Sequence, residues 1–258
     1  MDTPTFRDKV VLVTGASRGI GRAIAVEFAR LGADLALTAR TTAGVPSRFP
    51  GTLDETADAV REAGRRALVV PADITREEDA REIARRTLVE FGRVDVLVHN
   101  AGVSAPAPFV ETPLKRFDLV MNVNLRGPAI LTQELLPAMI ERDEGRIVNV
   151  NSYLPMTQDV PNQSVYSAAK MAFQNLIEWI AREMAPNGIA ANTLGIDREI
   201  VTEGWKLHRP DIDYSTWEAP KAVAEVATWI AAQPLAYTGR LVTIAQAREE
   251  MRAANPQR

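Results

Sequence analysis

The sequence predicts an α/β fold in which about seven parallel strands form one doubly wound sheet with helices on both faces. Strand-like and helix-like segments alternate about seven times along the 258 residues. The strand-like segments are almost continuously apolar, which is typical of parallel strands that helices cover on both faces. A glycine-rich turn joins the first strand to the first helix. These three observations together give the fold class.

The expected strands are short apolar runs bounded by glycine, proline or polar residues. The first, "KVVLVTG", is rich in β-branched residues and ends at Gly15. Its length is that of a strand and too short for a helix of ordinary size. The full set is 9–15, 34–40, 66–73, 94–100, 145–152, 188–194 and 240–245.

The expected helices show apolar residues three or four positions apart, with start and stop signals at their ends. In the first helix, Ile20, Ile24, Phe28 and Leu31 have this spacing, and Gly32 follows as a C-cap. The second begins at a threonine cap and ends at glycine. The full set is 19–33, 51–64, 76–92, 113–140, 163–184 and 220–232.

One domain accounts for the whole chain, residues 1–258, because no linker or internal repeat divides it. Its core is expected at about 8–245, followed by a polar tail at 246–258. The irregular stretch "TTAGVPSRFP" (41–50) predicts a long loop directly after the second strand.

Composition removes several classes of function. The chain has no cysteine, so disulfides and thiolate metal sites are excluded, and its two histidines make a metal site unexpected. A net charge of -3 with no basic cluster argues against nucleic-acid binding. The N-terminus resembles no signal peptide, and no apolar run reaches membrane-spanning length. We therefore expect a cytoplasmic protein that contacts neither membrane nor nucleic acid.

The turn "TGASRGIG" (14–21) has the composition of a phosphate-binding turn. Gly15 can bend the chain without a steric penalty, and Gly19 and Gly21 let the backbone approach a pyrophosphate. The helix that follows offers free N–H groups and the positive end of its dipole to the phosphates. The turn predicts a bound dinucleotide, and the alternative is a purely structural connection between strand and helix.

The end of the second strand predicts which dinucleotide is bound. Units that bind NAD usually place a carboxylate here for the ribose 2′-hydroxyl, but this chain has Ala39 followed by Arg40. An arginine can grip a 2′-phosphate through two hydrogen bonds, and Arg18 could approach the same phosphate from the glycine turn. We therefore expect NADPH/NADP⁺ rather than NADH, the alternative being that both arginines are solvated surface residues.

"YSAAK" (166–170) places a phenol and an amine on one face of a helix, four residues apart. Small residues between them let cofactor and substrate come close. A free tyrosine is a poor base at neutral pH, but a neighbouring ammonium favours the phenolate, so Tyr166 could act as a general acid/base. Lys170 could also hold the ribose hydroxyls. Alone, this pair is common by chance.

Pro128 lies four residues after Asn124. In a regular helix the N–H of residue 128 would bond to the carbonyl of Asn124, but proline has no N–H and its ring crowds that carbonyl. The carbonyl is therefore predicted to be free for a relay water, or the helix is simply kinked.

These segments resemble the short-chain dehydrogenase/reductase family, in family order and over about residues 8–245. The branch it resembles is a divergent one that includes hydroxysteroid-dehydrogenase-like proteins. The matching residues are "TGASRGIG" (14–21), Asp73 in "PADIT", "NAG" (100–102), Asn124 in "NVNLRG", Ser152 in "IVNVNS", and Tyr166 with Lys170.

The resemblance implies hydride transfer between a nicotinamide and a carbonyl or alcohol. It makes Tyr166 the acid/base, Ser152 the group that polarises the substrate oxygen, Lys170 the group that lowers the tyrosine pKa, and Asn124 the support of a relay water. It implies that Asp73 contacts the adenine and that Asn100 to Gly102 line the cleft. The expected cofactor-binding set is Gly15, Ser17, Arg18, Gly19, Ile20, Gly21, Arg40, Asp73, Ile74, Asn100, Ala101, Gly102, Tyr166 and Lys170.

The chain departs from the family pattern at four places. His99 replaces an asparagine and is expected to be packed and hydrogen-bonded. The loop 153–163 is one residue longer than usual, the Pro-Gly after the sixth strand is absent from "NTLGIDREIVTEG", and "IAQAREE" replaces a C-terminal glycine pair. These changes leave the substrate and the preferred direction of reaction open.

The expected substrate is an apolar carbonyl compound or secondary alcohol, because the segments that border the site are mostly apolar or aromatic. They are 104–109, Leu154, Pro155, Met156 and the lid 205–217, whose aromatic residues could instead only pack the lid. The resemblance implies a homo-oligomer, a tetramer or a dimer, built on the long helices at 113–140 and 163–184. The alternative function is a cofactor-binding redox sensor or scaffold with little turnover.

Overall fold

The structure is a computed structural model that describes residues 5–45, 47–152 and 160–254. The described residues form one parallel sheet of seven strands in the order β3-β2-β1-β4-β5-β6-β7, which confirms the predicted α/β, Rossmann-type fold. The strands are β1 (Val10–Thr14), β2 (Asp34–Ala39), β3 (Ala67–Pro71), β4 (Val96–His99), β5 (Gly145–Ser152), β6 (Ile189–Ile196) and β7 (Leu241–Thr243).

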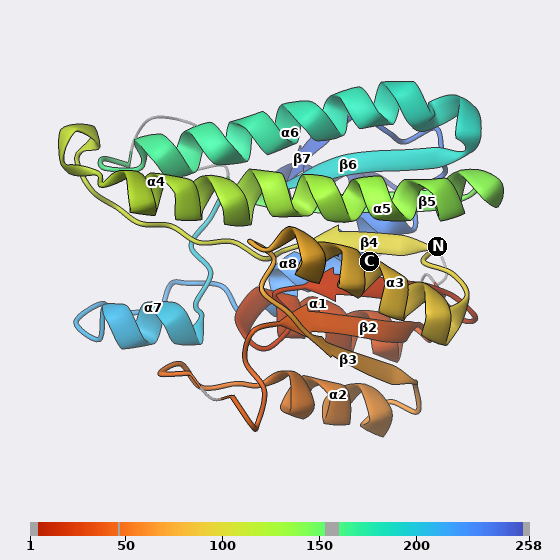
Figure 1. Cartoon of the computed structure of the whole chain (residues 1–258), viewed down its shortest axis with the longest axis horizontal. Coiled ribbons are helices and arrows are strands. Elements are labelled where there is room, and N and C mark those ends of the chain that lie inside the picture. The colour runs from red at the N-terminus through yellow and green to blue at the C-terminus, as the bar shows by residue number, and fades with distance from the viewer. Residues whose placement is uncertain (1–4, 46, 153–159, 255–258) are drawn as a thin grey trace.

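Helices cover both faces of the sheet (Figure 1). Because side chains alternate along a strand, Val11 and Val13 of β1 enter one core cluster and Leu12 enters the other. The first cluster includes α1 (Gly19–Arg30), α2 (Leu53–Glu62), α8 (Lys221–Ala231) and α9 (Ile244–Ala253). The second includes α3 (Glu77–Phe91), α5 (Gly127–Glu141) and α6 (Ser164–Met184).

Two further helices lie closer to the expected substrate side. The helix α4 (Leu114–Met121) precedes α5 and packs against α6. The short helix α7 (Glu203–His208) stands outside the layers in Figure 1, on the side of the loop that precedes α2. None of the helices in the described ranges is long and apolar enough to cross a membrane.

The predicted threonine cap of the second helix is present. The Thr52 hydroxyl accepts a hydrogen bond from the backbone N–H of Glu55 at 3.1 Å, and the Glu55 carboxylate accepts one from the N–H of Thr52 at 3.3 Å. This reciprocal capping box satisfies two N–H groups that the first turn of a helix leaves free. It therefore fixes where the loop after β2 ends.

The polar tail predicted at 246–258 is wrong for its first part, because residues up to Ala253 form α9. Thr243 caps this helix through a second capping box with Gln246, and Ile244 and Ala247 are buried against α8. The last strand is correspondingly shorter than the predicted 240–245. The apolar run that suggested a strand contains the first turn of a helix.

The helix predicted at 113–140 is interrupted. Between α4 and α5, Asn122–Arg126 form a π-helical turn, in which the N–H of Gly127 bonds to the carbonyl of Asn122. The expected break before Pro128 is therefore present, as a wider turn rather than a simple kink.

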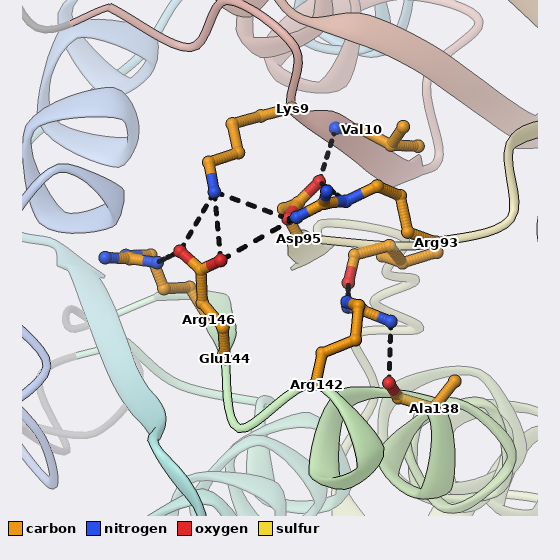
Figure 2. A network of polar contacts seen from close by, with 9 residues as sticks. Lys9, Val10, Arg93, Asp95, Ala138, Arg142, Glu144 and Arg146 are labelled. Atoms are coloured by element: carbon orange, nitrogen blue, oxygen red, sulfur yellow. Dashed lines mark hydrogen bonds and ion pairs between the residues drawn. The ribbon is translucent and has the colours of Figure 1, made fainter.

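The amino ends of β1, β4 and β5 are joined by a network of charged side chains (Figure 2). Asp95 is buried, accepts a hydrogen bond from the N–H of Val10 at 2.8 Å and pairs with Arg93 and Lys9. Glu144 accepts a hydrogen bond from Lys9 at 2.9 Å. In this network each carboxylate is paired, so it holds three strand ends together.

The carboxyl ends of the strands form the end of the sheet that is suited to binding a ligand. Consecutive crossovers run from β1 to β2 and β3, and then from β4 toward β7. The direction of winding reverses between β1 and β4, and a crevice forms beyond the carboxyl ends of the strands at such a point. The glycine turn follows β1, and Asn100 follows β4. Ser152 ends the neighbouring strand β5.

Candidate active site

The glycine turn after β1 has the geometry of a phosphate cradle. Gly15 and Gly19 have φ angles of +67° and +54°, which side chains disfavour. A Cβ atom at Gly21 would lie 2.2 Å from the carbonyl oxygen of Gly15. Only glycine fits these positions, so the backbone at the start of α1 stays open to a pyrophosphate. The residues present therefore fit a dinucleotide cofactor.

Thr14 and Asn100 fasten this turn to β4. The Thr14 hydroxyl accepts hydrogen bonds from the backbone N–H groups of Asn100 and Ala101, both at 3.0 Å. The Asn100 amide donates to the carbonyls of Thr14 and Gly15 at 2.9 and 3.2 Å. Two of the predicted cleft residues thus hold the turn in shape. The role of Thr14 was not predicted, although its place at the end of β1 was a usable signal.

Ser17, Ile20 and Ile74 lie around the same turn. Ser17 is buried, and Ile20 packs against the core cluster under α1. The backbone of Ile74 lies against Gly127, a residue that the sequence did not single out. A Cβ atom at Gly127 would lie 2.1 Å from the Ile74 carbonyl oxygen. Gly127 therefore lets the start of α5 approach the loop after β3.

Arg40 lies beside Asp73, with 3.9 Å between Nη1 and Oδ2. Its side chain is 70% exposed, so it can reorient toward a ligand at little cost. Asp73 is tied down by the backbone N–H and the hydroxyl of Thr75, at 3.1 and 2.9 Å. The structure thus brings together the residues predicted to contact the adenine and the 2′-phosphate.

Arg18 is held by the loop that follows β2. Its Nη2 donates to the hydroxyls of Thr41 and Ser47 and to the carbonyl of Gly51, at 2.9, 3.0 and 3.2 Å. Its guanidinium also lies 5.4 Å from the centre of the Phe49 ring. Burial lowers the pKa of Arg18, and the nearby Arg40 lowers it further. Arg18 therefore anchors the loop through Nη2. Its contact with the 2′-phosphate stays a prediction, which would use the other terminal nitrogen, Nη1.

The same loop reaches the α7 lid. Arg48 Nη2 lies 2.9 Å from Nε2 of His208, and the Phe49 and His208 rings are 5.2 Å apart. At the other end of α7, the Glu203 carboxylate faces the glycine turn, with Oε2 3.5 Å from the Cβ position of Gly19. Loop and lid therefore meet over the crevice.

The predicted catalytic residues converge at the carboxyl end of β5. The hydroxyl of Ser152 hydrogen-bonds to the phenol of Tyr166. The buried Lys170 donates to the carbonyl of Val150 at 3.1 Å, and its Nζ lies 5.9 Å from the centre of the Tyr166 ring. The spacing that suggested a shared helix face is confirmed by α6.

Electrostatics in the protein without cofactor differ from the expectation for this pair. Burial raises the pKa of Tyr166 to about 12, and the hydrogen bond from Ser152 offsets only part of that rise. Burial also lowers the pKa of Lys170 to about 8. Burial of the phenol therefore outweighs the interactions that favour the phenolate. At neutral pH Tyr166 is a phenol that carries a proton to donate.

Asn124 sits in the π-helical turn with its side chain fully engaged. Nδ2 donates to the carbonyls of Val103 and Val120, both at 2.8 Å, and Oδ1 accepts from the N–H of Val103 at 3.3 Å. The Cβ position of Gly102 lies 3.1 Å from this Oδ1 and 3.6 Å from Nζ of Lys170. The side chain thus clamps the loop after β4, and Gly102 keeps the space between Asn124 and Lys170 narrow.

Comparison with known proteins decides the family. The model of the short chain dehydrogenase family matches residues 9–196. The chain belongs to the short-chain dehydrogenase/reductase family.

Relatives in this family include a short chain dehydrogenase of Pseudocercospora fijiensis, 36% identical over 73% of this chain and 59% of its own length. Hydroxysteroid dehydrogenase-like protein 2 of Bos taurus is 30% identical over 90% of this chain and 55% of its own length. The chain thus spans little more than half of each of these two relatives. The second is of the kind that the divergent segments suggested.

Solved structures agree. A short chain dehydrogenase from Mycobacterium thermoresistibile is 30% identical, with a TM-score of 0.87 over 96% of this chain and 88% of that one. A metagenomic short-chain oxidoreductase in complex with NADP is 28% identical, with a TM-score of 0.78 over 92% of this chain and 96% of that one.

One departure from the family pattern, His99, lies beside the catalytic residues. It is 3% exposed and lies edge-on to Phe173, with ring centres 5.1 Å apart. Its Nε2 is 2.8 Å from the hydroxyl of Thr132. The expectation of a packed, hydrogen-bonded histidine is confirmed. Burial, together with the charge of Lys170, lowers its pKa to about 3, so His99 is neutral.

The segments predicted to border the substrate are only partly placed. Val103 and Ala105 pack with Tyr166, and the Ser104 hydroxyl donates to Gln163 at 2.7 Å, so this segment runs along the start of α6. Leu154, Pro155 and Met156 lie outside the described residues. In the lid, Trp217 packs edge-on to Trp205 and Tyr214, with ring centres 5.4 and 4.8 Å apart. These rings contact one another, and their predicted contact with a substrate stays a prediction.

Proposed function

We propose that the protein is an NADP(H)-dependent oxidoreductase that transfers a hydride between the nicotinamide and a carbonyl or secondary alcohol of an apolar small molecule. The observation that carries this is the hydrogen bond between Ser152 and Tyr166 at the open end of the sheet, with the Lys170 ammonium behind it. A substrate oxygen placed between the two hydroxyls would meet two donors at once.

In the direction of reduction, each residue has a distinct task. The bound nicotinamide supplies the hydride. Ser152 holds and polarises the substrate oxygen, and Tyr166 gives that oxygen its phenol proton. Lys170 stabilises the phenolate that remains, because its ammonium lies on the same helix face. Asn124 holds the loop after β4 in place beside these three side chains.

The choice of NADPH is supported by Ala39 and Arg40 at the end of β2. The exposed guanidinium of Arg40 can turn toward a 2′-phosphate, and Ala39 offers no carboxylate that would repel it. The positive charge of Arg40 lowers the pKa of Arg18, which shows that the two guanidinium groups lie near each other. Both arginines therefore contribute to one positive region. The metagenomic relative in complex with NADP is consistent with this assignment.

A panel of apolar ketones and aldehydes tests the proposal, with loss of NADPH absorbance as the readout. Turnover with at least one ketone, faster with NADPH than with NADH, is expected. Tight NADPH binding with no turnover across the panel would favour the redox sensor or scaffold instead. The hydrogen-bonded Ser152–Tyr166 pair supports catalysis over that alternative, since a sensor needs no proton donor at this place.

A homo-oligomer, a tetramer or a dimer, is the proposed assembly. Apolar side chains on the outer faces of α5 and α6 are exposed, including Ile140 (38%), Met171 (51%) and Trp179 (52%). Side chains of this kind gain by association because water leaves their surface. Sedimentation at micromolar concentration is expected to give a mass of two or four chains, and a monomer would contradict the assembly.

A further inference from the structure

His99 has a fixed tautomer. The Thr132 hydroxyl donates its hydrogen to the carbonyl of Pro128 at 2.9 Å. It can therefore only accept at Nε2 of His99, 2.8 Å away, so the imidazole carries its hydrogen on Nε2. The other nitrogen, Nδ1, is then a bare acceptor. Among the described residues it has no hydrogen-bond partner, although it is fully shielded from solvent.

An acceptor without a partner in a buried place is costly, and such groups are usually met by a donor or an internal water. Here a donor with spare capacity is close. Lys170 is buried and donates to one described acceptor, the Val150 carbonyl. An ammonium has three N–H groups, so two remain.

The register of the sheet brings the two groups together. His99 of β4 pairs with Asn149 of β5, and Lys170 is held by the next residue of that strand, Val150. Phe173, one helical turn after Lys170, touches the His99 ring. The charge of Lys170 also acts on His99. No direct hydrogen bond joins Lys170 to Nδ1 of His99, and a water can link two polar groups that do not meet directly.

We propose that Nδ1 of His99 accepts a hydrogen bond from the Lys170 ammonium through one bridging water, which makes His99 a positioning residue for the catalytic lysine. This inference deepens the proposed function at the same site. Its consequence is that Lys170 keeps its proton at a higher pH than its burial alone would allow.

Few other groups can disturb this pair. The titratable side chains of the cluster in the described residues are Lys170 and Tyr166 from α6 and His99 from β4. The neighbouring elements contribute uncharged polar groups: the amides of Asn124 in the π-helical turn and Asn151 in β5, and the hydroxyls of Thr132 in α5 and Ser152 in β5. The titration of Lys170 therefore reports mainly on its burial and on His99.

Two matched variants separate the two nitrogens of the imidazole. In His99→Asn the side-chain oxygen can take the place of Nδ1, and the contact with Thr132 is lost. In His99→Gln the longer side chain can reach Thr132, and the acceptor at Nδ1 is lost. If His99 only packs and holds Thr132, the glutamine variant should resemble wild type and the asparagine variant should not. The proposal predicts instead that the ionisation of Lys170 changes in His99→Gln and stays as in wild type in His99→Asn.

The readout is the ionisation of Lys170 in the free protein, followed by the ¹³Cε signals of labelled lysines. The chain has only five lysines, and Lys170→Arg assigns the signal. Burial alone gives a midpoint near pH 8, so with the bridge the wild-type midpoint is expected about one pH unit above that value. His99→Gln should lower it by about one pH unit, and His99→Asn should leave it in place. Equal midpoints in His99→Gln and wild type would overturn the proposal.

A measurement on the wild-type protein covers the case in which a variant does not fold. The chain has two histidines, so the ¹⁵Nδ1 signal of His99 is readily assigned. It should move with the Lys170 midpoint although His99 itself stays neutral, and a signal that is flat through that range would contradict the bridge. Neither measurement needs turnover, so an inactive ketone panel would refute the proposed function and leave this inference standing.

Discussion

Titratable side chains lie at both ends of the sheet, but they are paired with opposite charges at one end and not at the other. At the amino ends of β1, β4 and β5, the carboxylates of Asp95 and Glu144 are paired with several cations. At the carboxyl ends, Lys170 is buried and Tyr166 is partly buried, neither beside an opposite charge, and burial moves both pKa values toward the neutral forms.

This difference separates stability from function. A charge that is paired in the folded chain contributes to stability but has no capacity left for chemistry. A group that is buried without an opposite charge costs stability, but it is ready to exchange a proton with a substrate. The amino ends should therefore respond to substitution in melting temperature, and the carboxyl ends in rate.

The largest expected effect is at Tyr166. Tyr166→Phe keeps the ring and removes the proton, so the rate of ketone reduction should fall about 10³-fold, within the range for general acid catalysis. NADPH affinity and melting temperature should stay close to wild type. Steady-state kinetics and cofactor titration check this, and a variant with near-normal turnover would remove Tyr166 from the mechanism.

The acid side of the stability profile should carry the signature of His99. Its pKa is about 3 in the folded chain and near 6.5 when unfolded, so the unfolded chain binds the extra proton between these values. Stability is therefore lost as pH falls below about 6.5, by on the order of 3 kcal/mol at pH 4.

Urea unfolding at several pH values measures this loss. In His99→Asn the acid slope should flatten, while His208→Asn, on the exposed lid, should keep it. Identical slopes in wild type and His99→Asn would show that the buried imidazole accepts a proton without unfolding.

At the amino ends, Asp95→Ala should destabilise the fold without slowing the reaction. The variant loses the acceptor for the Val10 N–H and the partner of Arg93, an expected cost of about 2–3 kcal/mol and roughly 4–10 °C in melting temperature. Glu225→Ala, which removes an exposed pair with Lys221, is the control and should change stability by less than about 0.5 kcal/mol. A slower enzyme with an unchanged melting temperature would break the comparison.

The smallest expected effect is at Arg40, directly after β2. Arg40→Ala should weaken NADPH binding about tenfold and leave NADH nearly unaffected, because only NADPH carries the 2′-phosphate. Adding Ala39→Asp should turn the preference toward NADH, since a carboxylate there accepts from the ribose hydroxyl. KM values for NADPH and NADH in wild type and in the two variants test this assignment of Arg40. Equal weakening of the two cofactors would place the phosphate elsewhere, for instance at the loop that Arg18 anchors.

Much of the fold was predictable because local signals agreed with the tertiary structure. Apolar strands, glycine turns and the Thr52 cap mark their elements directly. The helix α9 was missed because an apolar run such as "LVTIA" fits a strand or a helix start equally well. The signal that could have decided it is the threonine at 243 with a glutamine three residues later, the spacing of a capping box.

The site was predictable as a set of residues, and less so as a set of charges. The spacing of Tyr166 and Lys170 fixes a shared helix face, but their pKa values depend on how deeply the fold buries them. The bare Nδ1 of His99 depends on which way one distant hydroxyl points. Gly127 gave no local signal, because its need to be small comes from Ile74, on another loop.

The π-helical turn before Pro128 has a further consequence in terms of helical phase. Val120 and Met139 are both buried, one before and one after the turn. An unbroken α-helix advances about 100° per residue, so two positions 19 apart would point about 100° away from each other. The wider turn absorbs one residue, and the 18 that remain complete roughly five full turns. A chain one residue shorter at this point could form an unbroken α-helix with the same two residues 18 apart, so the wider turn accommodates one inserted residue while Val120 and Met139 both stay buried.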